Sequence, residues 1–196
     1  LGPHESACFE TIAEHLRLKI PDERGVRVLL TATAPRPGAV TRRRRGGGVC
    51  YVAVDAFPGD ELPAAVLREA IRALDFASNT QPTVLNLLRA RLQAVGLGAP
   101  SRAYRYAPQA LAAVEADALV AKILAPGFER KTSLGDALDA LVPVVAPPWR
   151  EHLASPQRVD LTAAFNRVAE GLKKQATTQP ATGTTQPSNP TDEDSP

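Results

Sequence analysis

Two strand-like runs flank an arginine- and glycine-rich segment near the N-terminal end of the chain, and this pattern constrains the fold more than any other. In residues 26–33 and 49–57, apolar side chains alternate with polar or mixed ones, as in a β-strand with one buried face. Two prolines and a glycine end the first run, and three consecutive glycines precede the second. We therefore expect a β-hairpin whose long connection projects as a loop.

Several other segments have apolar residues at three- and four-residue spacing, which is typical of amphipathic helices. About six helices are expected, beginning near residues 6, 60, 82, 108, 133 and 160. Residues 101–106 are interpreted as a connector before a helix that Pro108 opens. Pro147, Pro148 and Trp149 are expected to form a stiff corner.

The sequence thus predicts an α+β fold that is mostly helical: the hairpin, which a short third strand could extend, packed with about six helices. With 196 residues, 44% of them hydrophobic, the chain can form one sizeable core. We expect one domain over residues 1–175, with a helix-hairpin part at 1–76 and a helical part at 80–175. Residues 176–196 are rich in Thr, Pro and Gln and are expected to form a disordered tail.

Cysteine content and hydropathy exclude some classes of protein. Cys8 and Cys50 are too few for a four-cysteine zinc site, and two buried free thiols are preferred over a bridge between them. No apolar run approaches the ~18 residues that span a bilayer, so we expect a soluble protein without a transmembrane segment. The chain begins at Leu1 and contains no methionine, so a processed or truncated N-terminus stays open and the location is unknown.

The most unusual chemical feature is the run of four consecutive arginines, Arg42, Arg43, Arg44 and Arg45, with Arg36 nearby. Guanidinium groups next to flexible glycines can bind phosphates or an acidic partner. A solvated, flexible loop explains the same residues equally well. A nuclear-localisation signal also fits four arginines.

A second candidate combines cations and aromatic rings at Arg102, Tyr104, Arg105 and Tyr106. This composition can stack bases and hold the phosphates of a single-stranded nucleic acid. The alternative is that the two tyrosines pack a connector onto the helices while the arginines reach water. Of the two interpretations, we favour the packing of the tyrosines.

No pattern in the sequence points to catalysis, a metal or a cofactor. The three histidines do not form a metal-ligand pair at helical spacing, and neither a phosphate-binding loop nor a hydrolase motif is present. We therefore single out no catalytic residue and expect no metal or cofactor.

The leading hypothesis is a non-enzymatic binding or assembly protein that uses its helical faces and the arginine loop. Its partner would be another protein or a second copy of the chain. The alternative is a nucleic-acid-binding protein that contacts phosphates through Arg42–Arg45. An enzyme with an unrecognised site comes third.

Overall fold

The computed structural model describes residues 2–18, 27–31, 39–44, 47–53, 58–77 and 82–178. In chain order the elements are η1 (Gly2–His4), α1 (Glu5–Leu16), β1 (Arg27–Thr31), β2 (Ala39–Arg44), β3 (Gly47–Ala53), α2 (Leu62–Ala77), α3 (Val84–Ala94), α4 (Arg102–Leu119), the π-helical turn η3 (Val120–Leu124), α5 (Asp136–Asp139), α6 (Val142–Ala154) and α7 (Leu161–Thr178).

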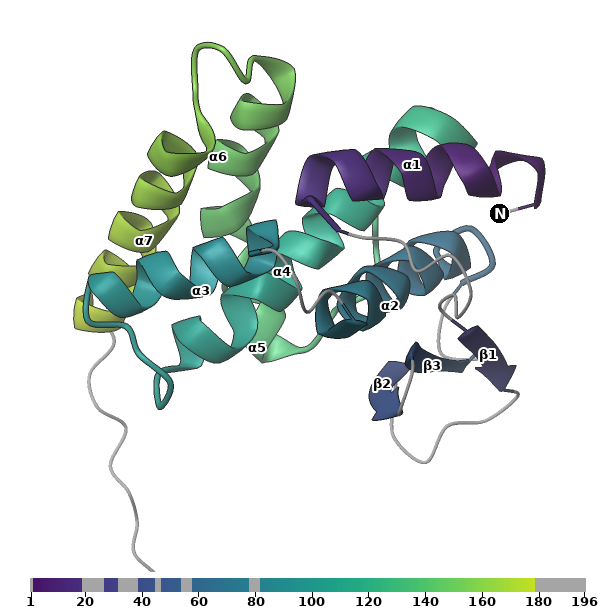
Figure 1. Ribbon diagram of the computed structural model, residues 1–196, viewed down its shortest axis with the longest axis horizontal. Coiled ribbons are helices and arrows are strands. Elements are labelled where there is room, and N and C mark those ends of the chain that lie inside the picture. Colours follow the sequence, from purple (N-terminus) through teal and green to yellow (C-terminus); the bar gives the residue numbers. More distant parts are fainter. Residues whose placement is uncertain are drawn as a thin grey trace, which may run out of the picture.

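The helices form a body around α4, and the strands lie beside α2 at one side of it (Figure 1). α2, α3, α5 and α6 all pack against α4, while α7 packs against α6 and α3. Other helices can surround α4 because many of its buried side chains are small. Its fully buried residues include Ala107, Ala110, Ala112 and Ala116. Alanine favours the helix and lets neighbouring helices approach closely.

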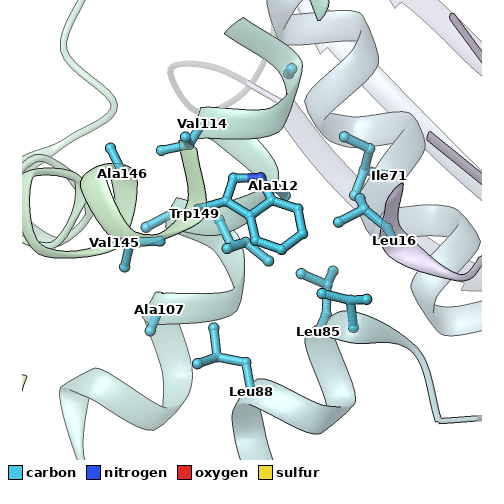
Figure 2. Packing of buried hydrophobic residues seen from close by; sticks show 14 of the residues in the cluster. Leu16, Ile71, Leu85, Leu88, Ala107, Ala112, Val114, Val145, Ala146 and Trp149 are labelled. Carbon is cyan, nitrogen blue, oxygen red and sulfur yellow. The ribbon is translucent and has the colours of Figure 1, made fainter. Parts of the chain in front are cut away.

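The core is centred on Trp149 of α6, whose side chain is 1% exposed. Figure 2 shows its ring among side chains that come from several helices; Leu16, Ile71 and Leu85 are three of these side chains. One large aromatic ring thus fills the space that the small residues of α4 leave open. Close packing extends to α7, where a Cβ added at Gly171 would lie 2.6 Å from Val144 Cγ1.

The three strands form one small sheet with the order β1-β3-β2. β1 is parallel to β3, whereas β2 is antiparallel to β3. α2 packs against all three strands. The sheet is therefore an addition to one side of a helical body.

The predicted α+β fold with a hairpin of residues 26–33 and 49–57 is wrong. The described residues are mostly helical, and the buried hydrophobic residues among those whose burial the structure describes lie in helices or beside them. The two runs are parallel neighbours, and β3 finds its antiparallel partner in β2, within the segment expected to project as a loop. Alternation defines the faces of a strand but not its partner, and only two residues separate β2 from β3.

Two further expectations about helix boundaries are also wrong. Residues 102–106 are not a connector but the first turns of α4, which Ser101 caps by accepting a hydrogen bond from Tyr104 N at 3.1 Å. Pro147 and Pro148 do not make a corner but lie inside α6. Pro108 likewise lies inside α4 rather than at its start. In both helices the burial of neighbouring apolar side chains outweighs the free-energy cost of a proline in the helix interior.

Other expectations are confirmed. α7 begins after Asp160, which accepts a hydrogen bond from Ala163 N at 2.7 Å. Cys8 is a free, buried thiol. α7 continues to Thr178, three residues into the predicted tail, and residues 179–196 lie outside the described part of the chain. None of the described helices is long and apolar enough to cross a bilayer.

Candidate binding cleft

An open cleft of about 620 Å³ lies between the segment that follows α4 and the side of α6. We call it the cleft. Its lining is Asp117, Phe128, Glu129, Arg130, Lys131, Thr132, Ser133, Asp139, Val142, Pro143 and Arg150. Charged groups thus stand beside apolar ones, a mixture typical of recognition sites.

The backbone enters the cleft through an irregular turn. The five residues of η3 follow α4 directly, and wider π-helical turns of this kind occur often near functional sites. Gly127, with φ of +84°, and Gly135, with φ of +92°, delimit the segment that forms the wall. These conformations favour glycine, so both ends of the wall are defined by the sequence.

A buried carboxylate fixes the middle of this wall. Glu61, which is 2% exposed, accepts hydrogen bonds from Lys131 N at 2.6 Å and Thr132 N at 3.0 Å. Burial acts to raise the pKa of Glu61, but these hydrogen bonds outweigh burial and hold the pKa below its ordinary value. The segment before α2 therefore holds the cleft wall from 70 residues away.

The other end of the wall closes on itself. Asp139 accepts hydrogen bonds from the Ser133 hydroxyl and from Leu134 N, and Gly135 N donates to Ser133 Oγ. These bonds tie Asp139, the last residue of α5, to the segment that precedes the helix. A wall held by its own hydrogen bonds is preorganised, which lowers the entropic cost of binding.

The side of the cleft next to α4 carries an ion pair between Asp117 and Arg130, in which two guanidinium nitrogens donate to the carboxylate. Burial raises the pKa of Asp117, and the Arg130 guanidinium opposes that shift. Because Asp117 already accepts from Arg130, this pair is a fixed part of the site.

Two cations remain available for a ligand. Arg150 is exposed, and within the described residues it makes no hydrogen bond or ion pair. Lys131 is also exposed and lies only loosely beside Asp60, with Nζ 3.9 Å from Oδ2. Phe128, Val142 and Pro143 supply apolar surface in the same cleft. The cleft can therefore bind an apolar side chain and an anionic group together.

A second polar arrangement lies inside the body, away from the cleft lining. Glu115 is fully buried, and its two oxygens lie 2.6 Å from His15 Nδ1 and 2.8 Å from Trp149 Nε1. The hydrogen bond to Glu115 raises the pKa of His15 and outweighs burial, which lowers it. This arrangement joins α1, α4 and α6 and has a structural role.

The residues singled out from the sequence lie in two separate places. Arg42, Arg43 and Arg44 lie in β2, whereas Arg36 and Arg45 fall outside the described residues. Arg102, Tyr104, Arg105 and Tyr106 lie in the first turns of α4, with both arginines exposed and both tyrosines half-buried. Whether either group binds a ligand stays a prediction.

The cleft itself was missed. Asp117, Arg130 and Arg150 are spread over more than thirty residues, and no local motif joins them. The one available signal was the polar segment 129–133 between Gly127 and Gly135, and an ordinary loop explains this segment equally well. Within the described part of the chain, no group of three His, Cys, Asp or Glu residues could hold a metal ion.

No protein-family model, curated protein or solved structure matches this chain. Any functional assignment therefore depends on the geometry of the molecule itself.

Proposed function

We propose that this protein is a non-enzymatic binding protein that holds an extended segment of a protein partner in the cleft. The observation that carries the proposal is a preorganised wall, held by Glu61, beside an exposed Arg150 that has no hydrogen bond or ion pair among the described residues. Arginine and aromatic residues dominate the binding energy of many protein interfaces. Phe128 and Arg150 are accordingly the two expected anchors.

An extended segment suits the cleft better than a folded surface does. The cleft is open and has apolar and charged groups side by side, so successive side chains of one peptide could meet different chemistry. Phe128, Val142 and Pro143 would contact an apolar side chain. Arg150 and Lys131 would bind a carboxylate beside it.

The proposal can be tested with a phage-displayed library of random dodecapeptides. Peptides enriched on the wild-type protein would be synthesised, and their affinity measured by fluorescence anisotropy. Phe128→Ala and Arg150→Glu should each weaken binding about tenfold or more, which corresponds to about 1.4 kcal/mol.

Arg158→Glu is the matched control, because Arg158 is exposed and does not line the cleft. It changes the net charge as Arg150→Glu does and should leave peptide affinity unchanged. If no enriched peptide depends on Phe128 or Arg150, or if Arg158→Glu weakens binding equally, the proposal is wrong.

The nucleic-acid alternative is favoured by one observation. The backbone of Arg42, Arg43 and Arg44 is paired with Val49, Gly48 and Gly47 in a sheet. A backbone that is already paired loses less entropy on binding a polyanion than the backbone of a free loop does.

A further inference from the structure

Arg130 has hydrogen-bond donors in the cleft that no described residue uses. Asp117 holds this side chain by two nitrogens: Nε donates to Oδ1 at 3.2 Å, and Nη2 donates to Oδ2. The third nitrogen, Nη1, makes no hydrogen bond among the described residues and is not one of their buried unpaired atoms, so it reaches solvent. A guanidinium fixed along one edge can therefore offer its other edge to a ligand.

Arg150 lies near the same carboxylate. Burial raises the pKa of Asp117. The guanidinium groups of Arg130, Arg68 and Arg150 oppose this shift, so all three lie close to the Asp117 carboxylate. Arg68 is paired with Glu69, with Nε 3.2 Å from Oε1. Arg150 has no such partner among the described residues, so two guanidinium groups near Asp117 keep unused N–H donors.

The acidic residues of the cleft lining leave these donors available. Asp117 is already bound by Arg130, and Asp139 accepts hydrogen bonds from the segment before α5. Glu129 is exposed and has no hydrogen bond or ion pair among the described residues, so it is the lining carboxylate that would oppose an anion. The unused charged donors of the cleft therefore exceed its unused carboxylates.

The arrangement of these donors indicates which anion fits. A carboxylate has one charge and two oxygens, which a single guanidinium fork satisfies. A phosphate monoester has about two negative charges at pH 7 and three terminal oxygens, so it can engage two guanidinium groups at once. Phe128 and Val142 supply apolar surface in the same cleft, which suits a phosphate that belongs to a segment with an apolar neighbour.

We propose that the cleft binds a phosphorylated side chain in the partner's extended segment. Arg150 and the Nη1 edge of Arg130 donate to the phosphate, and Phe128 contacts a neighbouring apolar side chain. This inference rests on the proposed function and names the anion that the partner carries. Asp117 is then a positioning residue, because it holds Arg130 without touching the phosphate.

Matched synthetic peptides test this proposal. A set of nonapeptides with varied flanking residues would be made in three forms, with serine, glutamate or phosphoserine at the central position. Their affinities for the wild-type protein would be measured by fluorescence anisotropy. For sequences whose binding depends on Phe128, the phosphoserine form should bind about tenfold or more tightly than the glutamate form, because phosphate engages both arginines.

Charge-conserving variants separate the guanidinium fork from charge alone. Arg150→Lys and Arg130→Lys keep the charge but lose the fork, so each should reduce the preference for phosphoserine over glutamate about threefold or more. Arg158→Lys is the matched control, because Arg158 is exposed and does not line the cleft, and it should leave the preference unchanged. The readout is a ratio of two affinities, and a variant that only weakens the fold lowers both affinities together.

Glu129 provides a variant with the opposite expected sign. Glu129→Gln removes the carboxylate that opposes the phosphate, so it should strengthen binding of the phosphoserine form about threefold and leave the serine form unchanged. Weaker binding of the phosphoserine form to this variant would contradict the proposed position of the phosphate.

Competition identifies the source of the phosphate. Inorganic phosphate lacks the apolar contact with Phe128, so it should bind about tenfold or more weakly than the phosphoserine peptide. Equal affinity would overturn the proposal in favour of a site for free phosphate. A 20-nucleotide oligouridine should not displace the peptide, because each of its phosphodiesters carries a single charge. Displacement at equal phosphate concentration would indicate a site for nucleic acid.

The outcomes separate this proposal from the function on which it rests. Peptides that bind through Phe128 and Arg150 without a preference for phosphoserine over glutamate would overturn this proposal and leave a peptide-binding cleft. No binding of any of the three forms would overturn both. A preference that survives Arg150→Lys, or that Arg158→Lys reduces equally, would also overturn the assignment of the phosphate to Arg150.

Discussion

Charged residues are arranged in opposite ways in the helical body and in the sheet. In the body, buried carboxylates have partners: Glu115 accepts from His15 and Trp149, and Glu61 accepts from two backbone amides. In the sheet, four arginines occur without any acidic residue in the strands. Partnered charges stabilise a fold, whereas gathered like charges favour a ligand of opposite sign.

The largest effect is expected from the centre of the body. Trp149→Ala removes a ring that is 1% exposed and also the donor to Glu115, so it should lower the free energy of unfolding by about 3–5 kcal/mol. Trp149→Phe, which keeps most of the volume, should cost less. Urea unfolding measures both, and a cost below about 1 kcal/mol for the Ala variant would contradict the packing in Figure 2.

The next effect tests the wall of the cleft. Glu61→Ala leaves the amides of Lys131 and Thr132 without their acceptor and should cost about 2 kcal/mol. Because the folded pKa of Glu61 is lowered, its contribution is present above the ordinary value of 4.5 and is lost as pH falls through the folded pKa. Unfolding measured across acidic pH should show a smaller loss of stability in Glu61→Gln than in the wild type.

A smaller, pH-dependent effect is expected at His15. Its pKa is raised in the folded state, so the stability that it contributes is fully present below the ordinary value of 6.5 and is lost as pH rises through the folded pKa. His15→Gln should remove this loss, of about 1 kcal/mol, from the stability profile. His4→Gln is the control, since His4 is exposed, and its profile should match the wild type.

The smallest effect is expected in the sheet. Replacing Arg42 and Arg44 by Ala should change the free energy of unfolding by no more than about 0.5 kcal/mol, because β2 lies in a small sheet beside the helical body and substitutions away from the core are usually this mild. Thermal unfolding of the variant measures it. A cost above about 2 kcal/mol would mean that these arginines stabilise the fold, as the carboxylates of the body do.

Local patterns predicted a helix well where a stripe of buried apolar residues alone determines its position. Leu67, Ile71 and Leu74 recur at helical spacing and are all buried in α2. The prolines in α4 and α6 misled the prediction, because tertiary burial can outweigh a local breaking signal. Ser101, which caps α4, was the sequence signal that could have placed its start correctly.

Long-range pairing could not be predicted in the same way. The alternation in residues 26–33 and 49–57 predicted strands, but the choice of neighbour depends on β2, whose three arginines do not resemble a strand. The cleft could not be predicted for the same reason, because its wall depends on a hydrogen bond from Lys131 N to Glu61, which lies 70 residues away in the sequence. Contacts of this kind depend on the assembled fold and leave no local pattern.

The parallel register of β1 and β3 is the central claim, since it replaces the predicted hairpin, and disulfide cross-linking tests it directly. In a background with Cys8→Ala and Cys50→Ala, pairs of cysteines would replace Arg27 and Val49, or Thr31 and Ala53. Adjacent strands lie about 4.8 Å apart, which is within the Cα range of a disulfide.

The account predicts that both of these in-register pairs form disulfides, because residues 27–31 run parallel to residues 49–53. The crossed pairs, 27 with 53 and 31 with 49, should not form disulfides, since about 13 Å along the strand would separate them. Efficient cross-linking of the crossed pairs, with none in register, would restore an antiparallel hairpin and contradict the parallel pairing of β1 with β3.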